Sequence, residues 1–301
     1  MDKTLILYVF HKVNDAVLYF IKHGIFKSDI YHFVFICNSL EESLDLVPKY
    51  VTIIKRENKG FDFGGWSVGL LENDRYKKYK NFIFVNSTCI GPFVPPYYKD
   101  PWCDIFINGL TDDIKLFGST INCCGHAEDG PQNYSHIQSW IFSTKISTLE
   151  FLIEKKIFSV DNFYTDKNLL IKDKEVRMSR IIIDNGWNIG CLMKNYENLD
   201  FRNLTNDTHF LSNIDSGDVS IDYVIHPYEL IFLKINREVF TRQIPKYFYK
   251  VKTVILSITV PPGCVEGQHF PLITPDGRHL KVECPRDVTP GQVVIVEVLS
   301  S

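Results

Sequence analysis

The chain has 301 residues, of which 45% are hydrophobic and 14% aromatic, so it can bury a sizeable core and has room for more than one domain. Its formal net charge of −3 at pH 7 gives no excess of positive charge for a phosphate backbone, which argues against a general nucleic-acid binder. Eight cysteines are scattered without C-x-x-C pairs. This favours a reducing compartment over a zinc site or a disulfide framework.

The first apolar run, at residues 4–10, is only seven residues long and is soon followed by His11 and Lys12. A membrane-spanning helix needs about 20 apolar residues, and no run in the chain approaches that length. We therefore interpret this run as a first strand. We expect no signal peptide or transmembrane segment, and a cytoplasmic protein that is either free or peripheral to a membrane.

The first part of the chain alternates apolar runs with amphipathic segments. The pattern predicts strands over 32–38 and 51–55, a helix over 14–23 and a short helix over 40–46. Because the strands alternate with helices, right-handed crossovers are expected. The predicted fold class is therefore α/β, with a doubly wound and mainly parallel sheet.

Two apolar runs, 51–54 and 82–85, each end in small polar residues. This pattern is typical of buried parallel strands, whose C-terminal loops bind ligands. The first loop, 57–65, surrounds Asp62 with glycines and suits a hydroxyl-rich ligand, although Asp62 would also cap a simple glycine turn. The second is the triplet Asn86-Ser87-Thr88, for which plain strand termination is the alternative. A helix is predicted to start near Trp66.

Downstream, residues 93–102 are rich in proline and aromatic residues and predict an ordered loop over the site. Short strands are predicted over 104–108 and 114–119. The stretch 122–140 begins as a loop and then turns apolar, as strand or helix. Where it re-enters the core we expect three candidate residues, for which a satisfied polar position is the alternative: His136, Gln138 and Ser139.

Further polar candidates follow this stretch. Helices are predicted over 148–155 and 173–185, and Glu175 lies in the first turn of the second. Glu175 is either a carboxylate favourable to the helix dipole or a general base. For His126, Glu128 and Asp129 a solvated loop is favoured over metal or substrate contact. After a polar loop over 200–220, two late residues either contact a diphosphate or are surface charge: His226 and Arg237.

From about residue 250 the composition changes to valine, proline and glycine. The segments 260–268 and 284–292 form an internal repeat with an offset of 24 residues. The turn sequence at 274–277 lies between two apolar runs and predicts a β-hairpin. We expect residues 250–301 to form a small all-β domain. It resembles V-P-x-G-V-x-x-G-Q repeats and the β-rich substrate-binding segment of J-domain chaperones, which implies a docking module for a protein partner.

The order of strand, glycine-containing loop, helix, strand and polar triplet resembles the donor-binding half of the GT-A glycosyltransferases. That resemblance implies a loop that holds a nucleotide and a D-x-D triplet that holds a metal ion and the diphosphate. Here the triplet is Asn86-Ser87-Thr88. Amide and hydroxyl oxygens are poorer ligands than carboxylates for the implied Mn²⁺ or Mg²⁺, so the metal requirement stays open.

The first 245 or so residues resemble the rhamnan-synthesis-type (RgpF-like) glycosyltransferases of bacteria, algae and large DNA viruses. The motifs that carry this resemblance are N-K-G-x-D-x-G-G at 58–65, the strand and N-S at 82–87, H-x-Q-S-W at 136–140, E-x-x-x-S at 175–179 and the run from His226 to Arg237. The resemblance implies a GT-A-like domain over residues 1–249. It also implies transfer of a sugar, with rhamnose as one candidate, from a nucleotide-sugar donor to a glycan or polysaccharide acceptor.

The resemblance also implies roles for the candidate residues. Asn58, Lys59, Gly60 and Asp62 would hold the nucleoside, and Asn86, Ser87 and Thr88 the diphosphate or sugar. Asp62, His136 and Glu175 would form the catalytic set, with His136 or Glu175 as the base. Gln138, Ser139, His226 and Arg237 would contact the acceptor or the diphosphate. Two alternatives stay open, namely an inactive GT-A-like protein that binds glycan or nucleotide, and an adaptor that acts through the β domain.

Overall fold

Contacts in the computed structural model divide the chain into two units, Met1–Gln243 and Ile244–Ser301. The structure describes residues 2–123, 135–204, 226–235, 253–273, 279–286 and 288–299. Each unit has its own strands and its own apolar core. The two units are therefore described separately.

The first unit is built on a sheet that has seven strands within the described residues, in the order β10-β6-β9-β4-β1-β2-β3. All neighbouring pairs are parallel except those of β9, which runs antiparallel to both β4 and β6. The predicted α/β class with a mainly parallel sheet is confirmed. The strands are β1 (Thr4–Phe10), β2 (Tyr31–Cys37), β3 (Thr52–Lys55), β4 (Asn81–Asn86), β6 (Ile114–Gly118), β9 (Ile141–Lys145) and β10 (Asn188–Cys191).

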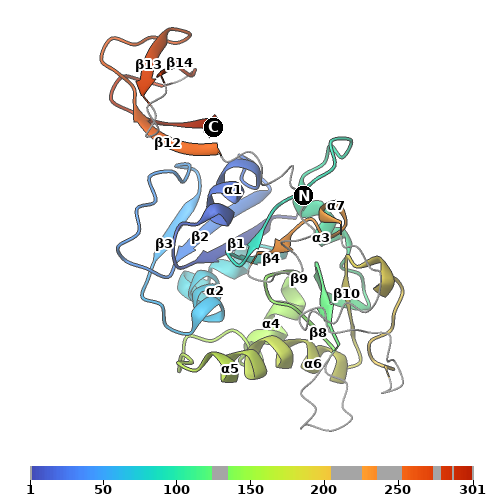
Figure 1. Ribbon diagram of the computed structural model, residues 1–301. Coiled ribbons are helices and arrows are strands. Elements are labelled where there is room, and N and C mark those ends of the chain that lie inside the picture. The colour runs from blue at the N-terminus through green and yellow to red at the C-terminus, as the bar shows by residue number, and fades with distance from the viewer. Residues whose placement is uncertain are drawn as a thin grey trace. The chain divides into compact units, whose positions relative to one another are not determined.

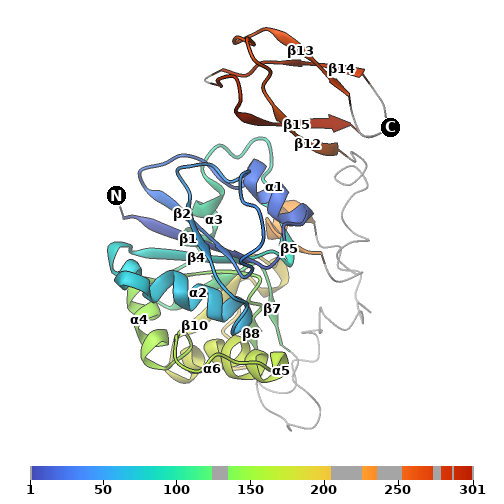
Figure 2. The ribbon, with the colours of Figure 1, turned by 90° about the vertical axis from the view of Figure 1, so that its left-hand side faces the viewer.

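Helices cover both faces of this sheet, with α1 and α3 on one side and α2 and α4 on the other (Figures 1 and 2). The longer helices are α1 (Asp15–His23), α2 (Phe61–Leu71), α3 (Trp102–Asn108), α4 (Ile146–Glu154) and α6 (Arg177–Asp184). The short helices are α5 (Lys167–Leu170), the π-helical η3 (Ile171–Val176), the 3-10 helices η1 (Glu72–Lys78) and η4 (Lys194–Tyr196), and α7 (Pro227–Leu230). Short strands lie beside the sheet: β5 (Cys89–Ile90), β7 (Ile121–Asn122), β8 (His136–Ile137) and β11 (Leu233–Lys234).

The core on each face is aromatic. On the α2 face, the Trp66 ring packs edge-on against Phe84 and Phe142 at centroid distances of 5.6 and 5.7 Å. On the α1 face, Tyr8 stacks on Phe20 at 4.3 Å. Strand β1 is buried along its whole length because side chains from both faces cover it.

Three predictions about these elements were wrong. Residues 40–46 form turns and bends, not a helix. Residues 104–108 were expected to form a strand but belong to α3, whose buried Trp102, Cys103 and Phe106 follow a helical spacing. The prediction failed because a short apolar run fits a helix and a strand equally well. Strand β3 was expected to be buried, but it is the edge strand and its residues are mostly exposed.

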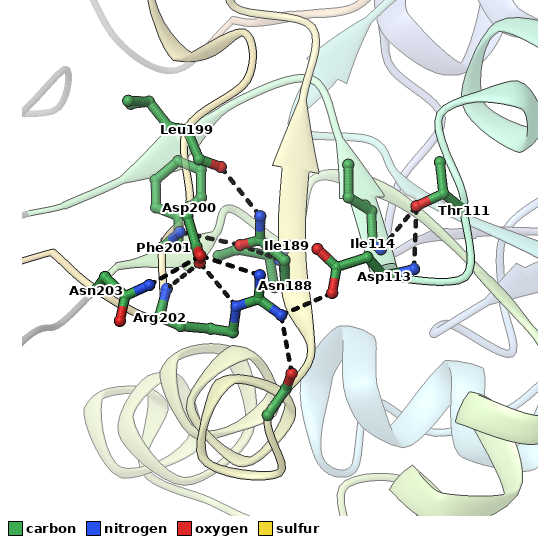
Figure 3. Close-up of polar contacts among 11 residues, drawn as sticks. Thr111, Asp113, Ile114, Asn188, Ile189, Leu199, Asp200, Phe201, Arg202 and Asn203 are labelled. Atoms are coloured by element: carbon green, nitrogen blue, oxygen red, sulfur yellow. Dashed lines mark hydrogen bonds and ion pairs between the residues drawn. The ribbon is translucent and has the colours of Figure 1, made fainter.

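A polar network holds the other edge of the sheet together, at the start of β6 and β10 (Figure 3). Arg202 Nη1 donates to Asp113 Oδ1 at 2.7 Å and to the Gly186 carbonyl at 3.0 Å. The side chain of Asn188 donates to the Leu199 carbonyl at 3.0 Å and accepts from Phe201 N–H at 3.0 Å. These contacts tie the segment after β10 to the amino-terminal ends of the two strands.

The second unit consists of two antiparallel strand pairs. β12 (Thr253–Thr259) pairs with β15 (Val293–Leu299), and β13 (His269–Ile273) pairs with β14 (His279–Glu283). The predicted hairpin is confirmed by the second pair, while its turn, at 274–278, lies outside the described residues. The all-β character of the described part agrees with the sequence prediction.

The internal repeat appears in this unit as equivalent hydrogen bonds. Gln268 Oε1 accepts from Val265 N–H at 3.3 Å, and Gln292 Oε1 accepts from Thr289 N–H at 2.8 Å. The donor and acceptor positions differ by 24 residues between the two bonds, which is the offset of the repeat. Each repeat also bonds to the start of the other, through Gly267 N–H to the Cys284 carbonyl and Gly291 N–H to the Val260 carbonyl.

The core of this unit follows the same offset. Its buried and partly buried apolar residues fall into pairs 24 positions apart: Ile258 and Val282, Val260 and Cys284, Cys264 and Val288, Phe270 and Val294, Leu272 and Val296. Each repeat therefore supplies the same set of positions to one shared core. Neither half can bury its apolar side chains without the other.

We expect Phe270→Ala to unfold the second unit selectively. Phe270 is 4% exposed and is the largest side chain of a small core, so its truncation should cost about 3 to 5 kcal/mol. Hydrogen exchange of the full chain should show loss of protection over 253–299 and unchanged protection over 2–123. Exposed Val293→Ala is the control, and equal loss of protection in both variants would contradict the prediction.

Candidate active site

Polar residues gather where β1, β2, β3 and β4 end. These four strands are parallel neighbours, so their carboxyl ends meet at one edge of the sheet. In open α/β sheets ligands bind at this edge. Asn86 is the last residue of β4, and Asn38 and Arg56 directly follow β2 and β3.

The two predicted loops meet through one hydrogen bond. Asn86 Nδ2 donates to Asp62 Oδ2 at 2.9 Å. Asn86 Oδ1 accepts from the backbone N–H of Thr88 at 3.0 Å and from its hydroxyl at 2.5 Å. The Ser87 carbonyl accepts from Asn14 Nδ2 at 3.2 Å. The amide of Asn86 thus fixes both the triplet and the carboxylate of Asp62.

A second carboxylate lies nearby, on the π-helical segment η3. Ser139 Oγ donates to Glu175 Oε2, and His136 Nε2 lies 3.9 Å from Glu175 Oε1. His136 is 6% exposed and Ser139 is 7% exposed. The structure therefore brings five of the predicted residues into one site: Asp62, Asn86, His136, Ser139 and Glu175.

The ionisation of Asp62 depends on both groups of residues in the site, Asn86 on one side and Glu175 on the other. Burial of the carboxylate and the negative charge of Glu175 raise the pKa of Asp62 to about 6, while Lys167 and the bond from Asn86 act in the opposite direction. A carboxyl group with a pKa near neutrality can exchange a proton at physiological pH. Such tuned groups are common in active sites.

Other predicted residues lie differently. Lys59 is exposed and forms an ion pair with Glu57 at 2.5 Å, and Asn58 is exposed beside it. Gln138 accepts from Thr120 Oγ1 at 2.7 Å in the protein interior, and His226 accepts from Tyr228 N–H at 3.1 Å as the N-cap of α7. Arg237 and the loop cluster of His126, Glu128 and Asp129 lie outside the described residues.

The glycine loop is shorter than the sequence indicates. Helix α2 begins at Phe61, so Asp62, Gly64 and Gly65 lie in the helix and the loop ends at Gly60. A side chain at Gly64 would bring its Cβ to 2.1 Å from the Lys59 carbonyl oxygen. At Gly65 the Cβ would lie 2.6 Å from Val9 Cγ2. These two glycines serve close packing of helix, loop and sheet, not a turn.

Sequence reasoning missed three residues around this loop. Arg56 donates to Asn38 Oδ1 at 2.6 Å and to the Lys59 carbonyl at 2.5 Å. Its guanidinium carbon lies 5.2 Å from the centroid of the Phe163 ring. Asn38 was visible as a polar residue at the end of a predicted strand, but no local pattern indicates Phe163 or the role of Arg56.

The residues present do not fit a divalent metal ion well. The triplet has no carboxylate, and Asn86 Oδ1 already accepts two hydrogen bonds. Within the described residues, no group of three or more His, Cys, Asp or Glu side chains is arranged to hold a metal ion. No step is therefore assigned to a metal.

The fold and the site place this chain among α/β proteins with a polar site at the carboxyl edge of a mainly parallel sheet. The sequence profile of the family described as "Rhamnan synthesis protein F" matches residues 33–216. This match covers more than half of the 301 residues, so the chain belongs to that family. The matched segment contains Asp62, Asn86 and Glu175.

Two curated relatives carry the name "Virulence protein VirA", one from Vibrio anguillarum (strain ATCC 68554 / 775) and one from Vibrio anguillarum. Each is 28% identical over 154 residues, which are 49% of this chain and 43% of the relative. The chain thus spans less than half the length of these relatives.

Among solved structures, the chain is similar to one titled "Crystal structure of a glycosyltransferase involved in the glycosylation of the major capsid of PBCV-1". The match has a TM-score of 0.27 and 12% identity, and covers 52% of this chain and 66% of the other. In the described parts of the chain, no helix combines the length and the apolar character needed to cross a membrane.

The raised pKa of Asp62 predicts a pH-dependent stability that Asp62→Asn removes. The unfolded chain ionises this group near pH 4 and the folded chain near pH 6, so the free energy of unfolding falls as the pH rises between these values. The effect is at most about 3 kcal/mol, and less where water screens the carboxylate. Urea unfolding from pH 4 to 8 should show Asp62→Asn gaining stability relative to the natural chain. A constant difference across that range would refute the assignment.

Gly64→Ala should disturb the loop before α2. The added Cβ meets backbone, the Lys59 carbonyl, so the loop must move, at a cost of about 1 to 3 kcal/mol. Gly69→Ala is the matched control in the same helix, because its Cβ meets the flexible side-chain ends Ile36 Cδ1 and Leu7 Cδ2. Amide exchange over 57–61 should rise about tenfold or more only in Gly64→Ala, and a similar rise in both variants would count against this account.

Proposed function

We propose that the protein is a glycosyltransferase that moves a sugar from a nucleotide-sugar donor to a glycan or polysaccharide acceptor. Membership in a family described by rhamnan synthesis supports sugar-polymer chemistry, with rhamnose as one candidate sugar. The observation that carries the proposal is the joined pair of polar segments at the carboxyl edge of the sheet, where Asn86 bonds Asp62 and Glu175 lies nearby.

Different residues of the site would bind the donor and accept the proton of the acceptor hydroxyl. The donor would be bound by the loop of Asn58, Lys59 and Gly60, by the carboxylate of Asp62 in the first turn of α2, and by the triplet that begins at the last residue of β4. Because Ser139 Oγ already holds one oxygen of Glu175, the other oxygen, Oε1, faces His136 and can accept a proton from an acceptor hydroxyl. We assign Glu175 as the base, with His136 Nε2 beside its second oxygen.

The leaving diphosphate develops negative charge that the site must offset. The triplet contributes the side-chain hydroxyl of Ser87. The Thr88 hydroxyl and the backbone N–H groups of all three triplet residues already donate within the protein. Lys59 and Lys167 are exposed cations near the loop and Asp62, respectively. We propose that these groups take the role that carboxylate-bound metal takes where a D-x-D triplet is present.

Glu175→Gln tests the base directly. The amide keeps the shape of the side chain and can still bond Ser139, but it cannot take a proton, so we expect kcat to fall about 10²- to 10⁴-fold with little change in donor affinity. Glu150→Gln, on the exposed side of α4, is the matched control. Undiminished kcat in Glu175→Gln would move the base to another residue.

Donor binding is measured first by thermal shift against UDP-, GDP- and dTDP-sugars, with and without Mn²⁺. A ligand at about 100 times its dissociation constant stabilises the folded chain by roughly 2.7 kcal/mol. A shift together with sugar transfer supports the transferase. A shift without transfer supports the second candidate, an inactive binding protein, which the missing carboxylates of the triplet favour. No shift in a folded sample argues against both.

A further inference from the structure

The backbone just before Asp62 is strained. Gly60 has a φ of 73° and Phe61 a φ of 50°, so two consecutive residues lie in the left-handed region. Glycine accepts this conformation freely, but phenylalanine does not. Such residues keep their conformation only where surrounding contacts hold them, and they concentrate at functional sites.

Two side chains hold this strained pair from both sides. Asn38 Nδ2 donates to the Phe61 carbonyl at 3.1 Å, on one side of the pair. Arg56 Nη2 donates to the Lys59 carbonyl at 2.5 Å, on the other. Arg56 Nη1 donates to Asn38 Oδ1 at 2.6 Å and so connects the two contacts. Asn38 and Arg56, which we call the clamp, follow adjacent strands, so the sheet itself fixes the spacing of the two residues.

Phe163 covers the clamp from the segment between α4 and α5. Its ring lies 5.2 Å from the guanidinium carbon of Arg56, within the range of a cation–π contact. A Cβ at Gly60 would lie 2.7 Å from Phe163 Cδ1. The ring therefore rests on the backbone that the clamp holds, and leaves the loop little room to move.

We propose that Arg56 and Asn38 are positioning residues of the active site, which hold residues 59–61 so that the carboxylate of Asp62 meets Asn86. This role rests on the proposed function for its effect on the donor, but its effect on Asp62 is a property of the free protein. Neither residue needs to touch the donor. Their contribution passes through the backbone to the carboxylate one position after the strained pair.

The charged groups around Asp62 come from elements other than the two strands that Asn38 and Arg56 follow. Glu175 lies on η3, with His136 of β8 beside it, and Lys167 lies on α5. Because Arg56→Lys keeps the positive charge, a change in the titration of Asp62 in that variant reports a shift of the carboxylate.

The chain offers a matched control for each clamp residue. Arg202 also bridges a backbone carbonyl and neighbouring side chains, and Asn188 also ties two backbone segments, both at the amino-terminal ends of strands (Figure 3). Arg56→Lys keeps the charge but loses the fixed fork of two donors. Asn38→Leu keeps the size and the neutral charge of the side chain, and loses both the N–H that donates to Phe61 and the oxygen that accepts from Arg56.

The experiment compares Arg56→Lys and Asn38→Leu with Arg202→Lys and Asn188→Leu, in the full chain. Without any donor, the pH midpoint of Asp62 is obtained from stability differences with and without Asp62→Asn. We expect the two clamp variants to lower this midpoint by about half a pH unit or more, and the controls to leave it unchanged. An unchanged midpoint in the clamp variants, or an equal shift in the controls, overturns the proposal.

The second measurement uses the nucleotide sugar that gives the largest thermal shift with the natural chain. We expect its affinity to fall about tenfold or more in Arg56→Lys, with kcat at saturating donor less affected, and to change less than twofold in Arg202→Lys. Equal affinity in Arg56→Lys and the natural chain overturns the positioning role. If the natural chain binds no nucleotide sugar, the proposed function fails, and the pH midpoint alone decides the proposal.

Discussion

The hydrogen bond between Asn86 and Asp62 depends on how closely α2 approaches the sheet. The bond joins the end of β4 to the first turn of α2, and the register of β1 and β4 places Asn86 opposite Val9. A Cβ at Gly65 would lie 2.6 Å from Val9 Cγ2, so any side chain there would push the helix outward. The close packing of an apolar interface thus sets a polar distance in the site.

Two carboxylates near each other repel, and the surrounding residues offset that repulsion. Glu175 raises the pKa of Asp62, while Lys167 and Asn86 lower it, and Ser139 donates a hydrogen bond to Glu175. These groups come from β4, α5, η3 and the segment before β9. The site therefore forms only when the sheet, α5 and η3 have packed together. A fragment of the chain that lacks one of these elements cannot form it.

How much of this was predictable depends on the range of the contacts. Apolar runs identified β1, β2 and β4, and the turn sequence between two apolar runs identified the β13–β14 hairpin, because these signals are local. The extent of the glycine loop was wrong, since glycines that permit close packing inside a helix look the same in sequence as glycines of a turn. Arg56 was missed because its partner Asn38 is 18 positions earlier in the chain, so the contact between them is visible only in the folded structure.

The electrostatics of the site explain why an amide suits position 86. Asn86 gives Asp62 a hydrogen-bond donor, which an aspartate at that position could not supply when ionised. A carboxylate there would instead place another negative charge beside Asp62 and Glu175. Only a bound cation or an added proton would offset it. The amide at position 86 therefore has two consequences. Asp62 is held by a neutral donor with its pKa at about 6, and the triplet lacks the carboxylate oxygen that a divalent metal ion prefers.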